Sequence, residues 1–137
     1  MKIVLDPGAK MPVRAHATDA GLDIFSKEPA IIPARDSYIF HTGVHIQLPE
    51  GTVGFLKSKS GLNTRFGITS EGVIDEGYTG EIVVKLYNNS NMDYVVRLGD
   101  KITQLVVLPL YPIKDLEIVE TLEKSERGDN GFGSTGK

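Results

Sequence analysis

The residues of this chain that could do acid–base chemistry are aspartates next to glycine-rich turns. Asp75 follows an apolar run and precedes a tight turn at residues 77–80. An acid in that position is often only a turn-forming residue, but a carboxylate held in a partly dry pocket can act as a general base. Asp19 and Asp23 flank three small or apolar residues at the predicted start of a strand. Taken singly, these residues leave both interpretations of Asp75 open.

A candidate anion site lies at residues 57–61, Lys-Ser-Lys-Ser-Gly, which combine two ammonium groups, two hydroxyls and a glycine. The segment follows a predicted strand and leads into the only predicted helix, and backbone N–H groups at a helix start attract anions. Its spacing is not that of a P-loop, so nothing supports that class of NTPase. A solvated loop is the alternative interpretation. Gln104, on a later predicted strand, carries no signal by itself.

The last fifteen residues, 123–137, differ in composition from the rest of the chain, with four glycines and one large apolar residue, Phe132. Such a segment buries too little apolar surface to offset its ordering entropy, so we expect it to be mobile in the free protein. One interpretation is a disordered tail. The other is a glycine-rich flap in which Arg127, Phe132, Ser134 and Thr135 contact a ligand.

Several function classes are excluded or disfavoured by composition. The chain has no cysteine, which excludes disulfides, thiol catalysis and thiolate zinc sites. His41 and His45 are four residues apart, but strand-like sequence broken by Gly43 makes a zinc site unexpected. The net charge of −3 and the absence of a basic block argue against nucleic-acid binding. No apolar run approaches the roughly 20 residues that span a bilayer, and the start is not a signal peptide, so we expect a cytoplasmic protein without a membrane partner.

Short β-rich runs separated by Gly and Pro turns predict an all-β fold, either a sandwich, a jelly roll or a small barrel, in a single domain of 137 residues. A short helix is expected near residues 60–65. We expect one β domain over residues 1–122 and a mobile flap over 123–137. The predicted strands cover residues 2–5, 22–26, 37–42, 44–48, 53–57, 81–87, 95–97, 102–110 and 116–122.

Five short motifs, taken together and in order, resemble those of the trimeric dUTP diphosphatases (dUTPases). They occupy residues 17–24, 59–62, 72–81, 99–105 and 127–136. Each string alone is weak, but five in family order over nearly the whole chain are a specific match. The resemblance implies a jelly-roll-like β-barrel or sandwich that forms a threefold trimer, with each active site shared between subunits. It also implies Mg²⁺-dependent hydrolysis of dUTP to dUMP and diphosphate, which limits uracil incorporation into DNA and supplies dUMP for dTMP synthesis.

The resemblance also implies roles for individual residues. Asp75 matches the aspartate that orients and deprotonates the water attacking the α-phosphorus, and Asp23 matches the one that reaches Mg²⁺ through water. Asp19 is expected to be a structural partner. Tyr78 matches the tyrosine that packs beneath the deoxyribose and excludes a ribose 2′-hydroxyl. The remaining matches bind phosphate (Lys59, Ser60, Gly61, Gln104, Arg127, Gly133, Ser134 and Thr135) or uracil (Thr69, Gly72, Val73, Ile74 and Phe132).

The chain departs from the usual family pattern at three positions. Lys59 stands where most relatives have arginine, which keeps the charge but loses the planar fork. Thr69 stands where many relatives place an asparagine against uracil, so base recognition leans more on the backbone. Asn130 replaces a glycine of the fifth motif, and asparagine tolerates a left-handed backbone better than most residues.

Two other functions share part of this pattern. A dCTP deaminase is similar in fold, but that family needs a glutamate near its uracil pocket, where this chain has the Asp75–Tyr78 arrangement and the glycine-rich flap. A regulatory role is the second alternative, because dUTPase-like proteins of phages can bind repressors. A repressor-type partner is therefore expected only if the chain is encoded by a phage.

Overall fold

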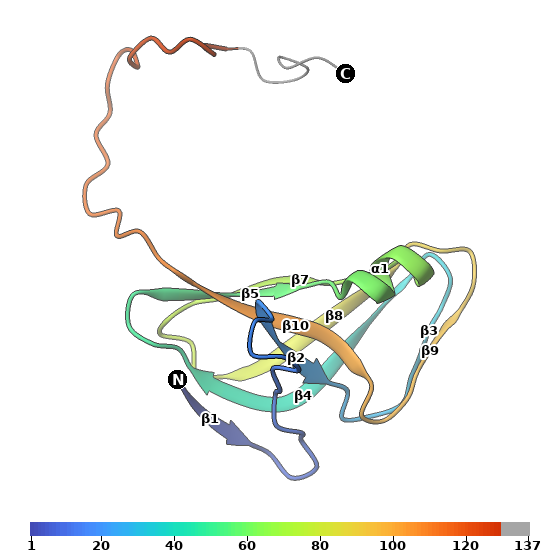
Figure 1. Cartoon of the computed structure of the whole chain (residues 1–137). Helices are drawn as coiled ribbons and strands as arrows, with labels where there is room; N and C mark the ends of the chain where they lie inside the picture. Colours follow the sequence, from blue (N-terminus) through green and yellow to red (C-terminus); the bar gives the residue numbers. More distant parts are fainter. Residues whose placement is uncertain (130–137) are drawn as a thin grey trace.

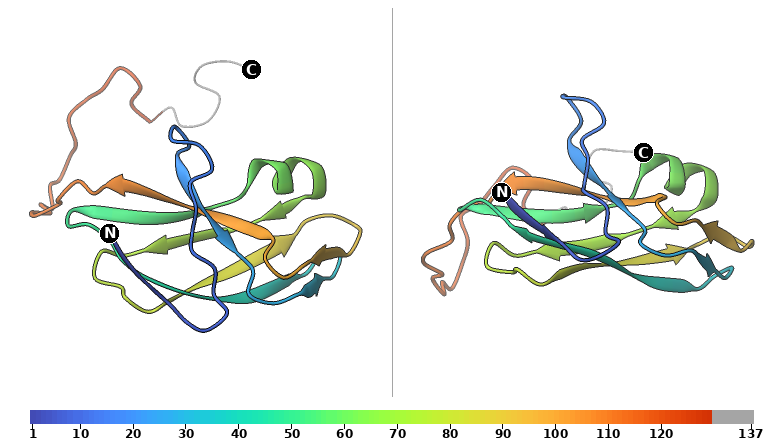
Figure 2. Two further views of the ribbon diagram at one scale, coloured as in Figure 1. Left: turned by 60° about the horizontal axis from the view of Figure 1, so that its bottom comes forward. Right: turned by 90° about the horizontal axis from the view of Figure 1, so that it is seen from below.

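The computed structural model describes residues 1–129, and two four-stranded antiparallel sheets form its framework (Figure 1). The sheets lie face to face, with the helix α1 (Ser60–Phe66) at one end of the sandwich (Figure 2). The first sheet has the order β1 (Lys2–Leu5), β4 (Ser37–Gln47), β8 (Glu81–Asn88) and β6 (Ile68–Thr69). The second has the order β2 (Gly21–Phe25), β10 (Lys101–Pro109), β5 (Thr52–Lys57) and β7 (Glu71–Ile74). A small third sheet pairs β3 (Ala30–Ile32) with β9 (Tyr94–Val96).

The core lies between the two large sheets and follows from the alternation of side chains along each strand. In β8, Ile82, Val84 and Leu86 are buried, while the residues between them face outward, as expected for a strand with one covered face. Phe40 of β4 and Leu105 of β10 complete the same cluster from the two sheets. The predicted all-β sandwich with one short helix is therefore confirmed. Among the described residues the sheets do not close into a barrel.

Strand β4 joins two strands that the sequence predicts separately, residues 37–42 and 44–48. Gly43, with φ of 66°, marks the junction, and the pairing with β8 shifts register between His41 and His45. Glu81 bridges this irregularity, because its carboxylate accepts a hydrogen bond from the Gly43 N–H at 2.7 Å and lies 2.8 Å from His41 Nδ1. His41 is thus part of a strand contact.

The predicted strand at residues 116–122 is wrong. The last strand ends at Pro109, and residues 110–129 form an extended arm without helix or strand that leaves the sandwich at the end opposite α1 (Figures 1 and 2). A strand needs a hydrogen-bonding partner, and residues 110–129 pair with no strand of the three sheets. The sequence analysis also missed the short strands β3, β6 and β7. No helix within residues 1–129 is long and apolar enough to cross a membrane.

The contacts of Glu81 generate a prediction about acid stability. The hydrogen bond with His41 outweighs desolvation and, with the Gly43 N–H, holds the pKa of Glu81 below its usual value of 4.5. A carboxyl with a lowered folded-state pKa stabilises the protein above its ordinary pKa, and this contribution is lost as the pH falls through the folded-state value. Glu81→Gln should therefore lower the free energy of unfolding by about 0.5–1 kcal/mol at pH 7, and the difference should vanish in acid.

Urea unfolding at equal protomer concentration checks this at neutral pH and well below pH 4. Glu71→Gln is the matched control, because it removes an ion pair with Lys57 in which both side chains are largely exposed. It is expected to change the free energy by less than about 0.5 kcal/mol. If Glu81→Gln lowers the free energy of unfolding equally at both pH values, the assigned role of the Glu81 carboxylate is contradicted.

Candidate active site

Three site segments meet on the second sheet, because strand pairing aligns them in one row. Asp23 of β2 lies directly opposite Gln104 of β10, and Gln104 lies opposite Lys57, the last residue of β5. The Gln104 amide donates to the Ser58 carbonyl at 3.1 Å, which ties β10 to the segment leading into α1. Gly21 leaves room for this side chain, since a Cβ there would lie 2.9 Å from Gln104 Oε1. The first, second and fourth motifs are therefore neighbours.

The Asp23 carboxylate is the electrostatic centre of this row. It is 7% exposed as a residue, and its two oxygens form ion pairs with different lysines: Oδ1 with Lys59 and Oδ2 with Lys101, the latter at 2.7 Å. Burial alone would raise the pKa of Asp23, but hydrogen bonds from Lys101 and Lys59 outweigh it and hold the pKa below its usual value. Lys101 is a site residue that the sequence analysis missed.

The predicted anion-binding residues stand at the start of α1, with Lys59 in extended conformation as the N-cap. Ser60 and Gly61 are exposed, and a Cβ at Gly61 would meet only open space. The helix ends at Gly67, whose left-handed backbone (φ 68°) closes the last turn. The start of this helix thus presents backbone and hydroxyl groups to whatever binds beside Asp23.

A buried hydroxyl network fixes the linker between β5 and α1. The Thr103 hydroxyl donates to the Lys57 carbonyl at 3.0 Å and lies 2.7 Å from the Ser70 hydroxyl. Ser58 completes the network, because its hydroxyl donates to the Ser70 carbonyl and accepts from the Ser70 N–H. Sequence reasoning missed these residues, since a serine or threonine in a strand or loop gives no signal until its partners are known.

The third motif forms the turn between β7 and β8. Asp75 is exposed, and its carbonyl accepts the Tyr78 N–H at 3.0 Å, as in a turn-forming residue. Tyr78 folds back over Gly80 and donates its hydroxyl to the Glu81 carbonyl at 2.8 Å. Glu76 anchors the other side of the turn by accepting the Gly51 N–H. The turn is therefore pre-organised.

Sheet register places Asp75 far from the other site residues of the same chain. Ile74 pairs with Gly54 and Glu71 pairs with Lys57. Asp75 therefore lies near the start of β5, whereas Lys59 follows its other end. Along the strand direction, Asp75 is displaced by four residues, or about 13 Å, from the position of Gln104. Across the sheet, two strand spacings of about 4.8 Å separate β7 from β10. The single chain does not bring Asp75 to Asp23 or Gln104.

The remaining predicted residues are scattered. In β7, Gly72 packs against Leu56, Val73 points outward at 61% exposure, and Ile74 is buried. Thr69 of β6 accepts a hydrogen bond from the Asn89 amide at 3.1 Å. Arg127 lies on the extended arm. The predictions for Phe132, Gly133, Ser134 and Thr135, and the departure at Asn130, lie outside the described residues.

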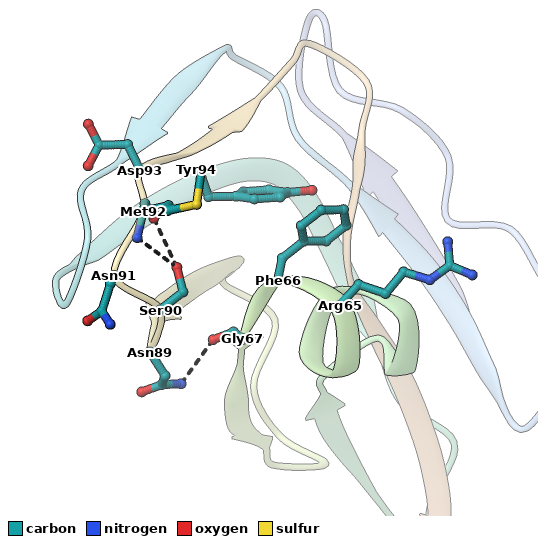
Figure 3. Close-up of a pocket in the computed structure, with 9 residues that line it drawn as sticks. All are labelled: Arg65, Phe66, Gly67, Asn89, Ser90, Asn91, Met92, Asp93 and Tyr94. Carbon is teal, nitrogen blue, oxygen red and sulfur yellow. Dashed lines mark hydrogen bonds between the residues drawn. The ribbon is translucent and has the colours of Figure 1, made fainter.

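A separate groove of about 550 Å³ opens at the far end of α1 (Figure 3). The rings of Phe66 and Tyr94 pack against each other there at 5.2 Å, and Arg65 points outward. Loop residues 89–93 close the other side through hydrogen bonds between Ser90 and Met92. None of the predicted site residues lines this groove, so it is not part of the site assembled above.

The dUTPase family model matches residues 8–136, and the chain belongs to this family. The deoxyuridine 5′-triphosphate nucleotidohydrolase of Kluyveromyces lactis is 41% identical over 130 residues, covering 94% of this chain and 88% of the relative. The dUTPase of Staphylococcus bacteriophage 80alpha with dUpNHpp is 32% identical with a TM-score of 0.91, over 99% of this chain and 98% of that one. A mutant dUTPase from phage phi11 of S. aureus, described with a structural Mg(II) ion, is 30% identical with a TM-score of 0.81, over 90% and 98%.

Proposed function

We propose that Asp75 of one subunit acts together with the residues around Asp23 of another subunit to hydrolyse dUTP to dUMP and diphosphate. The chain is a hydrolase of the dUTP nucleotidohydrolase family, which acts on phosphoric anhydrides. The observation that carries the proposal is the cluster around Asp23, where Lys59, the start of α1 and Gln104 converge. These groups suit a triphosphate, because ammonium, amide and backbone N–H groups all donate to phosphate oxygens.

Asp75 would supply the general base. Its carboxylate accepts a proton from the water that attacks the α-phosphorus, and holding that water in line accounts for much of the gain. The backbone of residues 72–75 would pair with the uracil edge, and the Tyr78 ring would pack beneath the deoxyribose. The hydrogen bond from Tyr78 to the Glu81 carbonyl supports this role, because it fixes the ring before substrate arrives.

The described residues fit a Mg²⁺ ion that arrives with the triphosphate. No group of three or more His, Cys, Asp or Glu side chains lies together within residues 1–129. Mg²⁺ keeps several waters and is bound through one or two carboxylates together with substrate phosphates. Asp23 would hold such an ion through its waters. When bound, the ion neutralises the charge that develops on the phosphate oxygens.

A homotrimer with shared active sites is supported by two features of the single chain. The first is the separation of Asp75 from the Asp23 row, which a neighbouring subunit can remove by bringing its own turn to that row. The second is the exposed apolar surface of the arm, since large exposed apolar stretches mark protein interfaces. The arm residues concerned are Leu110, Tyr111, Ile113, Leu116, Ile118, Val119 and Leu122.

The division into a β domain at residues 1–122 and a flap at 123–137 is kept as part of this proposal. Arg127 would clamp the terminal phosphate with its planar fork, and Phe132, Gly133, Ser134 and Thr135 would close over the nucleotide. A cytoplasmic location stays a prediction. A repressor-type partner also stays a prediction, since control of virulence-gene transfer by a G protein-like mechanism is described for the phage 80alpha dUTPase.

The substrate assignment is tested by incubating the protein with Mg²⁺ and dUTP, dCTP, dTTP or UTP, following diphosphate and ammonia. We expect diphosphate from dUTP alone.

Tyr78→Ala should reduce the preference for dUTP over UTP by about tenfold or more, because the ring that excludes the 2′-hydroxyl is gone. Tyr78→Phe is the control that keeps the ring. Ammonia from dCTP would favour the deaminase, and no product from any nucleotide would contradict the proposal.

Shared active sites predict complementation between two inactive variants. Asp75→Asn should lose turnover by several orders of magnitude, and Gln104→Ala should lose about 100-fold, as expected for removal of one phosphate donor. When the two variants are unfolded, mixed in equal amounts and refolded, about a quarter of the sites in random trimers combine an intact Asp75 with an intact Gln104. Recovery of about that fraction of wild-type activity is the expected result. A mixture no more active than its components would place both residues in one subunit's site.

The flap assignment is tested by deleting residues 126–137. The truncated protein should keep the trimer, because the apolar part of the arm is retained, but should bind dUTP weakly and turn over little. Size-exclusion chromatography and the diphosphate assay measure the two properties on one sample. Full activity of the truncated trimer would remove the flap from the mechanism.

A further inference from the structure

Lys101 reaches Asp23 because β10 contains a bulge. Lys101 pairs with Phe25 and Thr103 pairs with Ile24, so β10 uses one residue more than β2 over this stretch. Ile102 and Thr103, which follow each other in sequence, are both buried as a result. Side chains alternate along a regular strand, and without the extra residue Lys101 would lie on the face opposite Gln104. The bulge returns it to the face shared by Gln104 and Asp23.

The carboxylate that Lys101 contacts has little freedom. The Asp23 backbone exchanges two hydrogen bonds with Val13 on one side, and Asp23 lies opposite Gln104 on the other. Its side chain is 10% exposed, compared with 26% for Lys59 and 44% for Lys101. One nearly buried anion therefore pairs with two cations. Lys59 occupies Oδ1 and Lys101 occupies Oδ2.

A phosphate that binds Lys59 competes for the ammonium that pairs with Asp23 Oδ1. An ammonium is a compact point charge on a flexible stem, so turning it toward a phosphate weakens its contact with Oδ1. A buried carboxylate that loses its cation is costly, because desolvation is no longer offset. Lys101 contacts the other oxygen, Oδ2, so Asp23 would keep one cation if Lys59 turned away.

We propose that Lys101 is a positioning residue that keeps Asp23 paired and oriented while Lys59 moves from Oδ1 to a substrate phosphate. The proposal rests on the proposed function, because it assumes that a nucleotide triphosphate binds beside Asp23. Release of Oδ1 leaves that oxygen available to a water carried by the incoming Mg²⁺–triphosphate. Arginine at position 59 would depend less on Lys101, since different nitrogens of one guanidinium can hold a carboxylate and a phosphate together.

The experiment measures the Kd of a nonhydrolysable imido analogue of dUTP by calorimetry, with Mg²⁺ and again with EDTA. Lys101→Met should raise Kd about tenfold, the equivalent of one charged hydrogen bond, and the rise should persist in EDTA because it acts through Lys59. Lys101→Arg should stay within about twofold of wild type. Lys85→Met is the matched control, since it removes the same charge from an exposed position on β8 of the other large sheet, without touching Asp23.

A second comparison introduces Lys101→Met into the Lys59→Arg variant. The rise in Kd caused by Lys101→Met should shrink there to about twofold. If Lys101→Met does not fold, Lys101→Gln keeps a donor to Asp23 and allows the same comparison. A Kd no higher than that of Lys85→Met would overturn the proposal, as would an equal rise in Kd in both backgrounds. So would a lower free energy of unfolding with unchanged Kd. A wild-type protein that does not bind the analogue overturns the proposed function itself, which separates the two failures.

Discussion

The antiparallel pairing of β5 with β7 fixes the distance between the groups that hydrolysis needs. Lys59 follows one end of β5, and Asp75 follows the strand that runs back along β5 to its other end. Hydrogen bonds along the whole pairing hold this register, and a slip of one residue would turn Val73 and Ile74 to the wrong faces. If Asp75 is the base and the segment after β5 binds phosphate, as proposed, the two groups of one chain lie too far apart to act on one phosphorus. The proposed chemistry therefore depends on assembly.

The same constraint gives a reason for the exposed arm. It leaves β10 at Pro109, which pairs with Thr52 at the Asp75 end of the sheet. β10 is paired on both sides, and the arm joins none of the three sheets. Its apolar residues are too many for a solvated linker and too few to fold alone. Burial against a neighbouring subunit, as proposed, would account for both their number and their exposure.

Much of the fold could be predicted from the sequence, because turn residues and alternation are local signals. The helix after Lys59 and most strands of the two large sheets were found in this way. The strand at residues 116–122 was predicted wrongly, since its apolar residues are β-like but the described part of the chain offers them no partner. Gly43 is predicted to break the strand in two, because a glycine at a bulge and a glycine that ends a strand look alike in sequence; the structure gives one strand with a positive φ there.

The site was predicted less completely than the fold, for a related reason. Motif order identified Asp23, Ser60 and Gln104, and strand pairing does bring those segments together. Lys101 could not be found, because simple alternation puts it on the face opposite Gln104, and only the packing of Ile102 and Thr103 into the core reveals the extra residue.

The lysine at position 59 makes this hidden residue consequential. With arginine there, one planar side chain could hold the carboxylate and a phosphate at once. With lysine, the chain needs a second cation on Asp23, and the bulge in β10 supplies it. The two positions are coupled through a carboxylate that neither motif shows when read alone.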